Sequence, residues 1–154
     1  MTDKALEAAA LTDLPALLSR IESGSGPDRE LDTAIAIAIE GWRDSGFGSQ
    51  TGEEILFDEN NKVVSAPAYT IDLNACIALC ERVLGPDPWF AIERQNGIKP
   101  HTEAKFWAAC SPKNWSDAEL KKRGLTTAPS GWATTPARAL LAAIVKARMA
   151  QDDH

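Results

Sequence analysis

Apolar residues in the first part of the chain recur every three or four positions, which is the spacing of one face of an α-helix. Asp13 is a suitable N-cap for the first such helix, and Gly24 suits the position after its end. The segment 31–42 is ambiguous, because its isoleucines and alanines alternate as they would in a β-strand. Alanine favours helices, however, and five apolar residues of the segment share one helical face, so we predict a second helix.

Two further helices are indicated by the residues at their ends. Thr70 begins one that Gly85 ends, and Thr135 begins another that runs to about Ala150. Residues 111–131 have the composition of a long loop, but a capping box after Ser116 predicts one short helix inside it.

Strand-like alternation of side chains occurs in residues 89–94 and 104–110. Asn96-Gly97 lies between them and favours a tight type I′ turn, so we predict an antiparallel pair. The stretch 44–68 has a loop-like composition, within which residues 55–64 are compatible with a small hairpin.

The predicted order of elements is helix, helix, hairpin, helix, strand, strand, helix. Helices combined with an antiparallel sheet indicate an α+β fold, in which the helices pack on a small sheet as a helix–sheet–helix sandwich. The 154 residues suffice for one domain with a substantial core. We expect residues 1–26 to form an N-terminal helix and linker, and residues 27–150 to form a single domain.

The net charge of −6 conceals an uneven distribution. Residues 1–84 carry 15 acidic and 6 basic side chains, a net −9, whereas residues 85–150 carry 5 acidic and 10 basic, a net +5. An acidic protein repels the phosphate backbone, so general nucleic-acid binding is not expected. The basic second half can still hold a small anion, although solvated faces also differ in charge by chance.

Catalytic and metal-binding patterns are weak in this sequence. Cys76 and Cys80 lie four apart on one helical face and are expected to be buried apolar residues in a reducing compartment. His101 is the one histidine away from the C-terminus, so no metal site, cofactor or enzymatic activity is predicted, although a dyad of His101 with Cys110 or a serine remains open.

The sequence also lacks membrane signals. No stretch approaches the roughly 18 consecutive apolar residues of a membrane-spanning helix. The N-terminal residues include acids where a signal peptide has a basic region. We therefore expect a cytoplasmic protein with no membrane partner.

Aromatic and cationic side chains come together in the predicted strand pair. If Phe106 faces the core, Lys105 and Trp107 share the opposite face, where an indole can stack a base and an ammonium can hold a phosphate. On the neighbouring strand, Phe90 and Arg94 share one face. Phe90 is a further candidate for stacking, and Arg94 is a further candidate for phosphate binding. The alternative is that helices cover both faces of the sheet and that these residues serve packing.

The start of the last helix is a second candidate anion site. Its free backbone N–H groups favour anions, and Arg138 lies in its first turn, where a cation is electrostatically misplaced unless an anion is bound. Thr135 is a candidate contributor to that site or simply the helix cap. Arg43, which follows Gly41-Trp42, is a further candidate ligand residue.

Several short motifs resemble the phage ABA sandwich domain family of small phage and prophage proteins. They are Pro27-Asp28-Arg29-Glu30-Leu31-Asp32, Gly41-Trp42, Pro67-Ala68-Tyr69-Thr70 with Asp72, and Ala133-Thr134-Thr135-Pro136-Ala137-Arg138-Ala139-Leu140. The resemblance covers roughly residues 27–150 and implies a phage-encoded helix–sheet–helix protein acting in a bacterial cytoplasm. The family is in turn similar to Thoeris anti-defence sponges, which bind a cyclised ADP-ribose signal and hold it uncleaved.

Together, these features predict a non-enzymatic phage counter-defence protein, a homo-oligomer, that sequesters a small anionic cyclic nucleotide. Its expected ligand residues are Arg43, Phe90, Arg94, Lys105, Trp107, Thr135 and Arg138. One alternative is an inhibitor that binds a bacterial defence complex, its acidic first half mimicking nucleic acid. Another is an accessory phage protein with no dedicated ligand.

Overall fold

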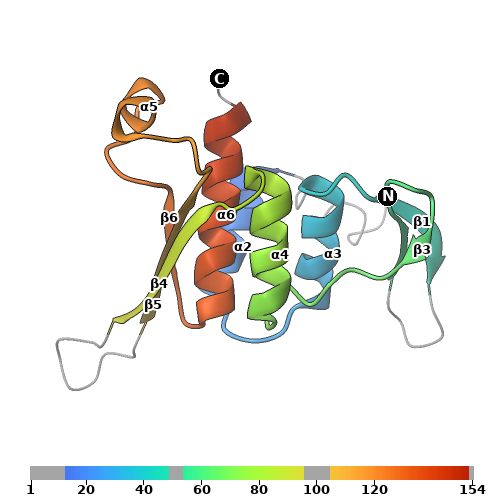
Figure 1. Cartoon of the computed structure of the whole chain (residues 1–154). Helices are drawn as coiled ribbons and strands as arrows, with labels where there is room; N and C mark the ends of the chain where they lie inside the picture. The colour runs from blue at the N-terminus through green and yellow to red at the C-terminus, as the bar shows by residue number, and fades with distance from the viewer. Residues whose placement is uncertain (1–12, 49–53, 96–104, 153–154) are drawn as a thin grey trace, which may run out of the picture.

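The computed structural model describes residues 13–48, 54–95 and 105–152 (Figure 1). Four helices make up most of this part of the chain: α2 (Leu14–Ser23), α3 (Arg29–Ala38), α4 (Leu73–Leu84) and α6 (Pro136–Asp152). A short helix, α5 (Asp117–Lys122), lies between two strands of a sheet.

The strands form two separate three-stranded antiparallel sheets. The first consists of β1 (Arg43–Gly48), β2 (Glu54–Phe57) and β3 (Val63–Val64), in that order. The second consists of β4 (Trp89–Gln95), β5 (Lys105–Ser111) and β6 (Ser130–Ala133), with β5 in the centre.

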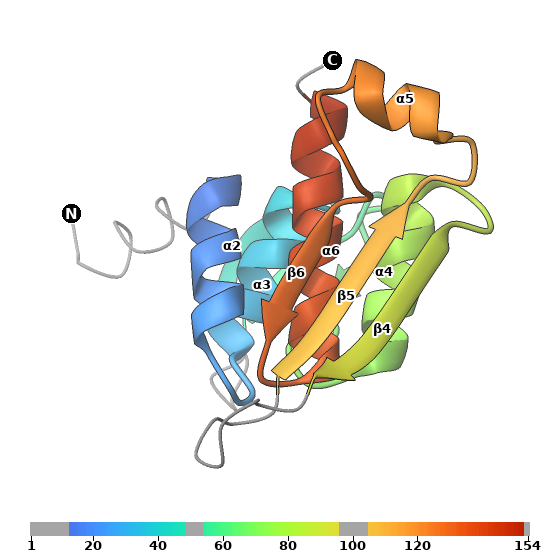
Figure 2. The same cartoon turned by 90° about the vertical axis from the view of Figure 1, so that its left-hand side faces the viewer.

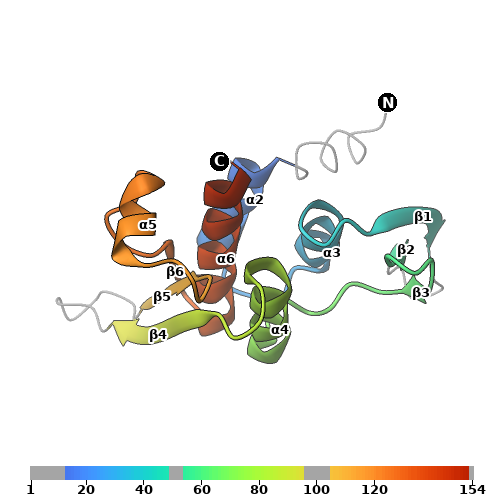
Figure 3. The ribbon, with the colours of Figure 1, turned by 45° about the horizontal axis from the view of Figure 1, so that its top comes forward.

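Helix α6 lies at the centre of the molecule. Figures 1 and 3 show the second sheet on one side of it, α2 and α4 beside it, and α3 with the first sheet farther away. Every residue from Ala137 to Val145 in α6 is buried, because sheet and helices surround this segment. The small alanines of α6 allow these neighbours to approach closely, and the hydrophobic core is therefore built around this helix.

Local hydrogen bonds explain where the helices begin. The Asp28 carboxylate accepts a hydrogen bond from the Leu31 N–H at 3.0 Å and so caps α3, and Thr135 Oγ1 accepts one from the Arg138 N–H at 3.2 Å at the start of α6. Helix α4 is capped by Asp72, which accepts a hydrogen bond from the Asn74 N–H, and not by Thr70 as predicted. Thr70 is fully buried, and its hydroxyl instead accepts a hydrogen bond from the Asp28 N–H.

The structure confirms the predicted α+β class, with helices packed on a small antiparallel sheet. The predicted helices, the strands corresponding to β4 and β5, and the hairpin of β2 and β3 are all present. In the described residues the helices cover one face of β4–β5–β6, and the other face is open in Figure 2. The Asn96-Gly97 turn lies outside the described residues.

Two strands occur where loops were predicted. All of β1 except its first residue lies in the loop-like stretch 44–68, and β6 begins at the end of the stretch 111–131 and extends to Ala133. Both are rich in residues with low β-propensity, and both are strands because a neighbouring strand supplies hydrogen-bond partners. The prediction was therefore wrong for these two segments.

Helix α2 packs in the same core as the later elements. Leu17 and Ile21 are fully buried, and α2 lies beside both α6 and β6 (Figure 2). In the part of the chain that the structure describes, no helix is both long enough and apolar enough to cross a membrane.

Candidate ligand-binding site

One face of the second sheet carries an unusual number of tryptophans. Because side chains alternate along a strand, Ile92, Phe106, Ala108 and Cys110 face the helices and their neighbours in sequence face outward. The outward residues, which we call the tryptophan face, are Trp89, Ala91, Glu93, Gln95, Lys105, Trp107, Ala109, Ser111, Ser130 and Trp132.

The strand register brings two of these tryptophans together. Trp107 on β5 lies directly opposite Trp132 on β6. The Cys110 N–H donates to the Pro129 carbonyl at 3.1 Å, and because bonded positions alternate, Trp107 and Trp132 form a non-hydrogen-bonded pair. Cα atoms in such pairs are about 4.5 Å apart, so the two indoles lie close to each other.

Two tryptophans of this face are accessible to solvent, whereas Trp107 is half-buried and Ala109 is buried. Trp89 is 49% exposed and Trp132 is 45% exposed, whereas large apolar side chains are ordinarily buried. Figure 2 shows this face toward the viewer, with α6 and α4 behind the sheet and α5 beyond its upper end. Among the described residues, no helix lies over the face, so the indoles can contact a ligand.

Two cavities, of about 460 and 480 Å³, open on the surface of the protein. One of them adjoins the tryptophan face. This α5 cavity, of about 480 Å³, lies between Trp89 and the α5 segment. The lining residues are Trp89, Ser111, Pro112, Lys113, Trp115, Asp117, Leu120, Thr126, Thr127 and Ala128. The guanidinium of Arg123 lies 4.4 Å from the ring centre of Trp115 and helps to hold that indole in place.

The second cavity, of about 460 Å³, lies between α3, α4 and α6. Its charges are largely paired: Glu40 forms an ion pair with Arg82, and Arg148 forms one with Asp152 at 3.5 Å. The pKa of the Tyr69 hydroxyl is raised, mainly because the group is buried and secondly because the Glu40 carboxylate is near. Paired charges bind a further ion weakly, so this cavity is the weaker candidate.

The structure separates the seven predicted ligand residues. Lys105 and Trp107 lie together on the tryptophan face, as the alternation predicted. Phe90 and Arg94 lie on the other face of β4, opposite Cys110 and Phe106, and both are exposed.

Arg43 and Thr135 lie elsewhere in the molecule. Arg43 is in β1, where its guanidinium contacts the Asn61 side chain and lies 5.7 Å from the Phe57 ring centre. Thr135 caps α6.

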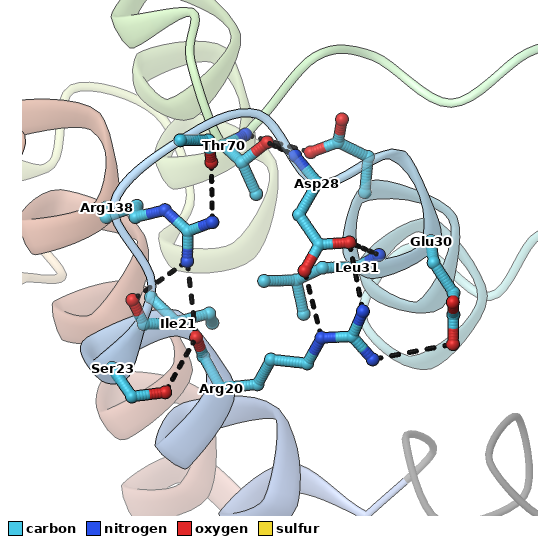
Figure 4. Close-up of polar contacts among 10 residues, drawn as sticks. Arg20, Ile21, Ser23, Asp28, Glu30, Leu31, Thr70 and Arg138 are labelled. Carbon is cyan, nitrogen blue, oxygen red and sulfur yellow. Dashed lines mark hydrogen bonds and ion pairs between the residues drawn. The ribbon is translucent and has the colours of Figure 1, made fainter.

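Arg138 has partners within the protein. Its side chain is buried, with only 2% exposed, and its guanidinium donates to the carbonyls of Arg20, Ile21 and Gly26 at 3.2, 3.1 and 2.6 Å (Figure 4). Arg20 and Ile21 lie in the last turn of α2, where the helix dipole is negative. The carbonyls of α2 thus stabilise a cation that the sequence alone leaves misplaced.

A carboxylate network surrounds this arginine. Asp28 accepts two hydrogen bonds from the Arg20 guanidinium, at 2.9 and 3.0 Å, while also capping α3 (Figure 4). The Asp32 carboxylate accepts from the Thr70 N–H at 2.8 Å. Burial lowers the pKa of Arg138, an effect that the nearby Asp28 and Asp32 oppose. Arg138 therefore ties α2, α3 and α6 together in the interior and is not available on the surface.

Sequence reasoning missed three tryptophans of the site. Trp132 was assigned to no element, because it follows the predicted loop 111–131, and Trp115 lay within that loop. Strand alternation in the sequence predicts that Trp89 and Phe90 lie on opposite faces. The sequence does not predict how near Trp89 lies to Trp107, because that depends on the strand register. Gly131 offers a local signal, because a glycine within a strand often marks the close approach of another backbone.

The structure also shows where the cysteines lie. Cys76, Cys80 and Cys110 are buried and reduced, which confirms the first two as core residues. Across the described ranges, no group of three or more histidine, cysteine, aspartate or glutamate side chains is arranged to hold a metal ion. His101 lies outside the described residues, so the alternative of a dyad with Cys110 is not tested.

No family model, curated protein or solved structure matches this chain. The resemblance to the phage ABA sandwich family therefore stays a prediction.

Proposed function

We propose that this protein binds and sequesters a small nucleotide-like ligand, one with a planar ring and an anionic group, on the tryptophan face and in the adjoining α5 cavity. The observation that carries the proposal is a group of three tryptophans, the exposed Trp89 and Trp132 and the half-buried Trp107, on a sheet face that no described helix covers. Exposure of indole rings to water is unfavourable, and a ligand ring stacked on them removes this apolar surface from water.

Ring stacking is the main expected interaction. Stacking of a base on an aromatic side chain contributes about 1–3 kcal/mol per base. The Trp107–Trp132 pair offers one indole surface, and Trp89 with Trp115 at the α5 cavity offers a second. Two surfaces on one sheet suit a ligand with two rings or two neighbouring bases.

Two lysines are placed to contact an anionic group. Lys105 is exposed and lies two positions before Trp107 on the same face. Lys113 lines the α5 cavity and forms an ion pair with Asp87 at 3.1 Å, in which both side chains are more than 70% exposed. Such an exposed pair is weak, so a phosphate can replace Asp87 at little cost.

The proposal includes no chemical conversion of the ligand. The described side chains of the tryptophan face are indoles, alanines, two serines, a glutamine and the two charged groups of Glu93 and Lys105, with no hydrogen bond between a nucleophile and a base among them. Together with the resemblance described above, this supports a phage counter-defence role in a bacterial cytoplasm, with the protein acting as a homo-oligomer.

The alternative of an acidic mimic of nucleic acid has less support. Asp58 accepts hydrogen bonds from the backbone N–H groups of Asn60 and Lys62, each at 2.9 Å, and so shapes the β2–β3 turn. Glu59 accepts from the Trp42 indole N–H at 3.0 Å. These carboxylates have local structural roles, which is sufficient reason for their presence in the sequence.

Thermal melting against a panel of cyclic nucleotides and cyclic ADP-ribose isomers tests the proposal. A ligand at a hundred times its dissociation constant adds about 2.7 kcal/mol, which raises the melting temperature by roughly 5–10 °C. Ligand released by heating is then examined by chromatography. Intact ligand supports sequestration, whereas altered ligand indicates an enzyme.

Matched tryptophan variants locate the site. Trp132→Ala and Trp107→Ala are expected to abolish the ligand-induced shift, and Lys105→Ala to weaken it. Trp42→Ala removes a tryptophan that lies far from the face, beside Glu59, and is expected to bind as the wild type does. The proposal fails if no panel member raises the melting temperature, or if Trp107→Ala and Trp132→Ala bind normally.

A further inference from the structure

Strand β4 is an edge of the second sheet with no neighbour on its outer side in the described part of the chain. The strand order is β4–β5–β6, so β4 pairs with β5 alone. It extends for seven residues, Trp89–Gln95, in regular register with β5, and it contains neither proline nor lysine. Long exposed edges of regular register offer a row of unpaired backbone groups and pair readily with another strand.

The other sheet edges have features that discourage pairing. The register of β1 shifts between Asp44 and Gly48, and β3 is only two residues long. β6 has four residues and lies beside α2 (Figure 2). Bulges, short strands and covering helices are the usual protection of an edge, and β4 has none of them.

The hydrogen-bond pattern shows which backbone groups of β4 are free. The Cys110 N–H points to β6, where it meets the Pro129 carbonyl at 3.1 Å. Successive residues of a strand point their backbone groups to opposite sides, so Ala109 and Trp107 point to β4 and bond to Ala91 and Glu93. The N–H and C=O groups of Phe90, Ile92 and Arg94 therefore point away from the sheet.

We propose that β4 pairs antiparallel with β4 of a second copy of this chain, around a two-fold axis that passes through Ile92. A two-fold axis perpendicular to the sheet places Ile92 opposite itself and Phe90 opposite Arg94 of the partner subunit. All three donors and three acceptors of each edge are then paired. A shift of two residues in either direction leaves one of the three residues without partners.

The side chains complement each other in this register. Phe90 is 38% exposed and Arg94 is exposed, and both lie on the helix-side face of β4. The pairing brings each arginine next to the phenylalanine ring of the other subunit, and a guanidinium over such a ring is favourable. This explains an exposed apolar ring and an unpaired cation that the described part of the single chain leaves without a partner.

The proposed dimer extends the tryptophan face. A two-fold axis perpendicular to the sheet keeps the same face outward in both copies, so the joined sheet has six strands and presents the tryptophans of both subunits on one side. The dimer interface does not depend on the proposed function, because it is formed by β4 backbone groups, Phe90 and Arg94 without any ligand contact.

Sedimentation velocity over about 2 to 200 µM protein tests the pairing, because small edge-to-edge interfaces are weak. The expected result is a concentration-dependent species of twice the 16.6 kDa of one chain. Arg94→Pro removes an outward N–H without removing a bond to β5, since proline is tolerated there on an edge strand. By symmetry it removes two hydrogen bonds per dimer, about a 30-fold loss of affinity at about 1 kcal/mol each.

Two controls keep this result interpretable. Arg94→Lys retains both the N–H and the positive charge and is expected to dimerise nearly as the wild type does. Circular dichroism and the melting temperature of Arg94→Pro at low concentration establish that the fold is intact. If Arg94→Pro unfolds, the charge variants described next decide the question.

A charge exchange tests the register itself. Phe90→Lys places an ammonium opposite Arg94 of the partner subunit and is expected to abolish the dimer. Adding Arg94→Glu to the same chain creates an attractive pair and is expected to restore the dimer only in the proposed register. A single species of 16.6 kDa at 200 µM wild type overturns the proposal, as does a dimer unaffected by these changes. Failure of the exchange to restore the dimer overturns the register.

Discussion

Gly131 lies where β6 packs against α6, and its lack of a side chain sets the distance between the sheet and the helix. A Cβ atom built at this position would lie 2.4 Å from Ala142 Cβ, 2.9 Å from the Ala139 carbonyl oxygen and 3.0 Å from the Ala143 nitrogen. Two of these are backbone atoms of a buried helix, and the third is fixed to that backbone. No rotation of a flexible side chain relieves the contact.

The Gly131→Ala change is therefore expected to be strongly destabilising. Overpacking of a core typically costs about 1–3 kcal/mol, and the rigidity of these neighbours favours the upper end of that range. For a chain of about 150 residues, about 3 kcal/mol corresponds to a fall of roughly 6–12 °C in melting temperature. The displaced β6 also carries Trp132, so ligand-induced stabilisation is expected to decrease as well.

Gly26→Ala provides the matched control. No heavy atom lies within 4 Å of a Cβ built at Gly26, and the backbone there is not left-handed. The substitution is expected to change stability by less than about 1 kcal/mol, with a small gain from restricting the unfolded chain. Thermal melting and urea unfolding of both variants measure the difference. If Gly131→Ala melts within 2 °C of the wild type, on the order of 0.5–1 kcal/mol, the close sheet–helix contact is refuted.

Three further predictions follow from the interior of the protein. Arg138→Met leaves three carbonyls without donors and is expected to cost about 2–5 kcal/mol in urea unfolding, whereas Arg148→Met removes a half-exposed ion pair and is expected to cost less than 1 kcal/mol or so. Asp28→Ala removes a helix cap and is expected to cost about 1–2 kcal/mol more than Asp28→Asn, which keeps a capping oxygen; equal melting temperatures contradict the capping role. The three thiols are buried, and burial raises the pKa of Cys76 to about 12, so a chromogenic thiol reagent is expected to react slowly until denaturant is added. Fast reaction of the native protein would show that the cysteines are accessible.

The helices were predictable because their signals are local. Asp13, Ser116 and Thr135 precede their helices directly, and the apolar stripes behind them repeat at 3.6-residue spacing. The exception is informative: Thr70 has the chemistry of a cap, but Asp72, two residues later, performs that role. Thr70 instead bonds to Asp28, which lies 42 positions earlier in the chain.

The strands show the limit of local signals. β4 and β5 alternate clearly, but β1 and β6 are strands because other strands bond to them. A glycine-containing segment such as Ser130–Ala133 has little β-propensity of its own. Its pairing with β5 depends on a neighbour that precedes it by about 20 residues, and so on the tertiary fold.

The sequence by itself determined the fold class and the shared face of Lys105 and Trp107, because helix caps and the two-residue period of a strand act over a few residues. Only the tertiary structure decided that Trp132 lies on this face and that Arg138 is buried. Trp132 is placed by strand register. Arg138 is held by carbonyls that lie up to 118 positions earlier in the chain. A charge near a helix end predicts a ligand only when the rest of the protein supplies no counter-charge, and no local pattern contains that information.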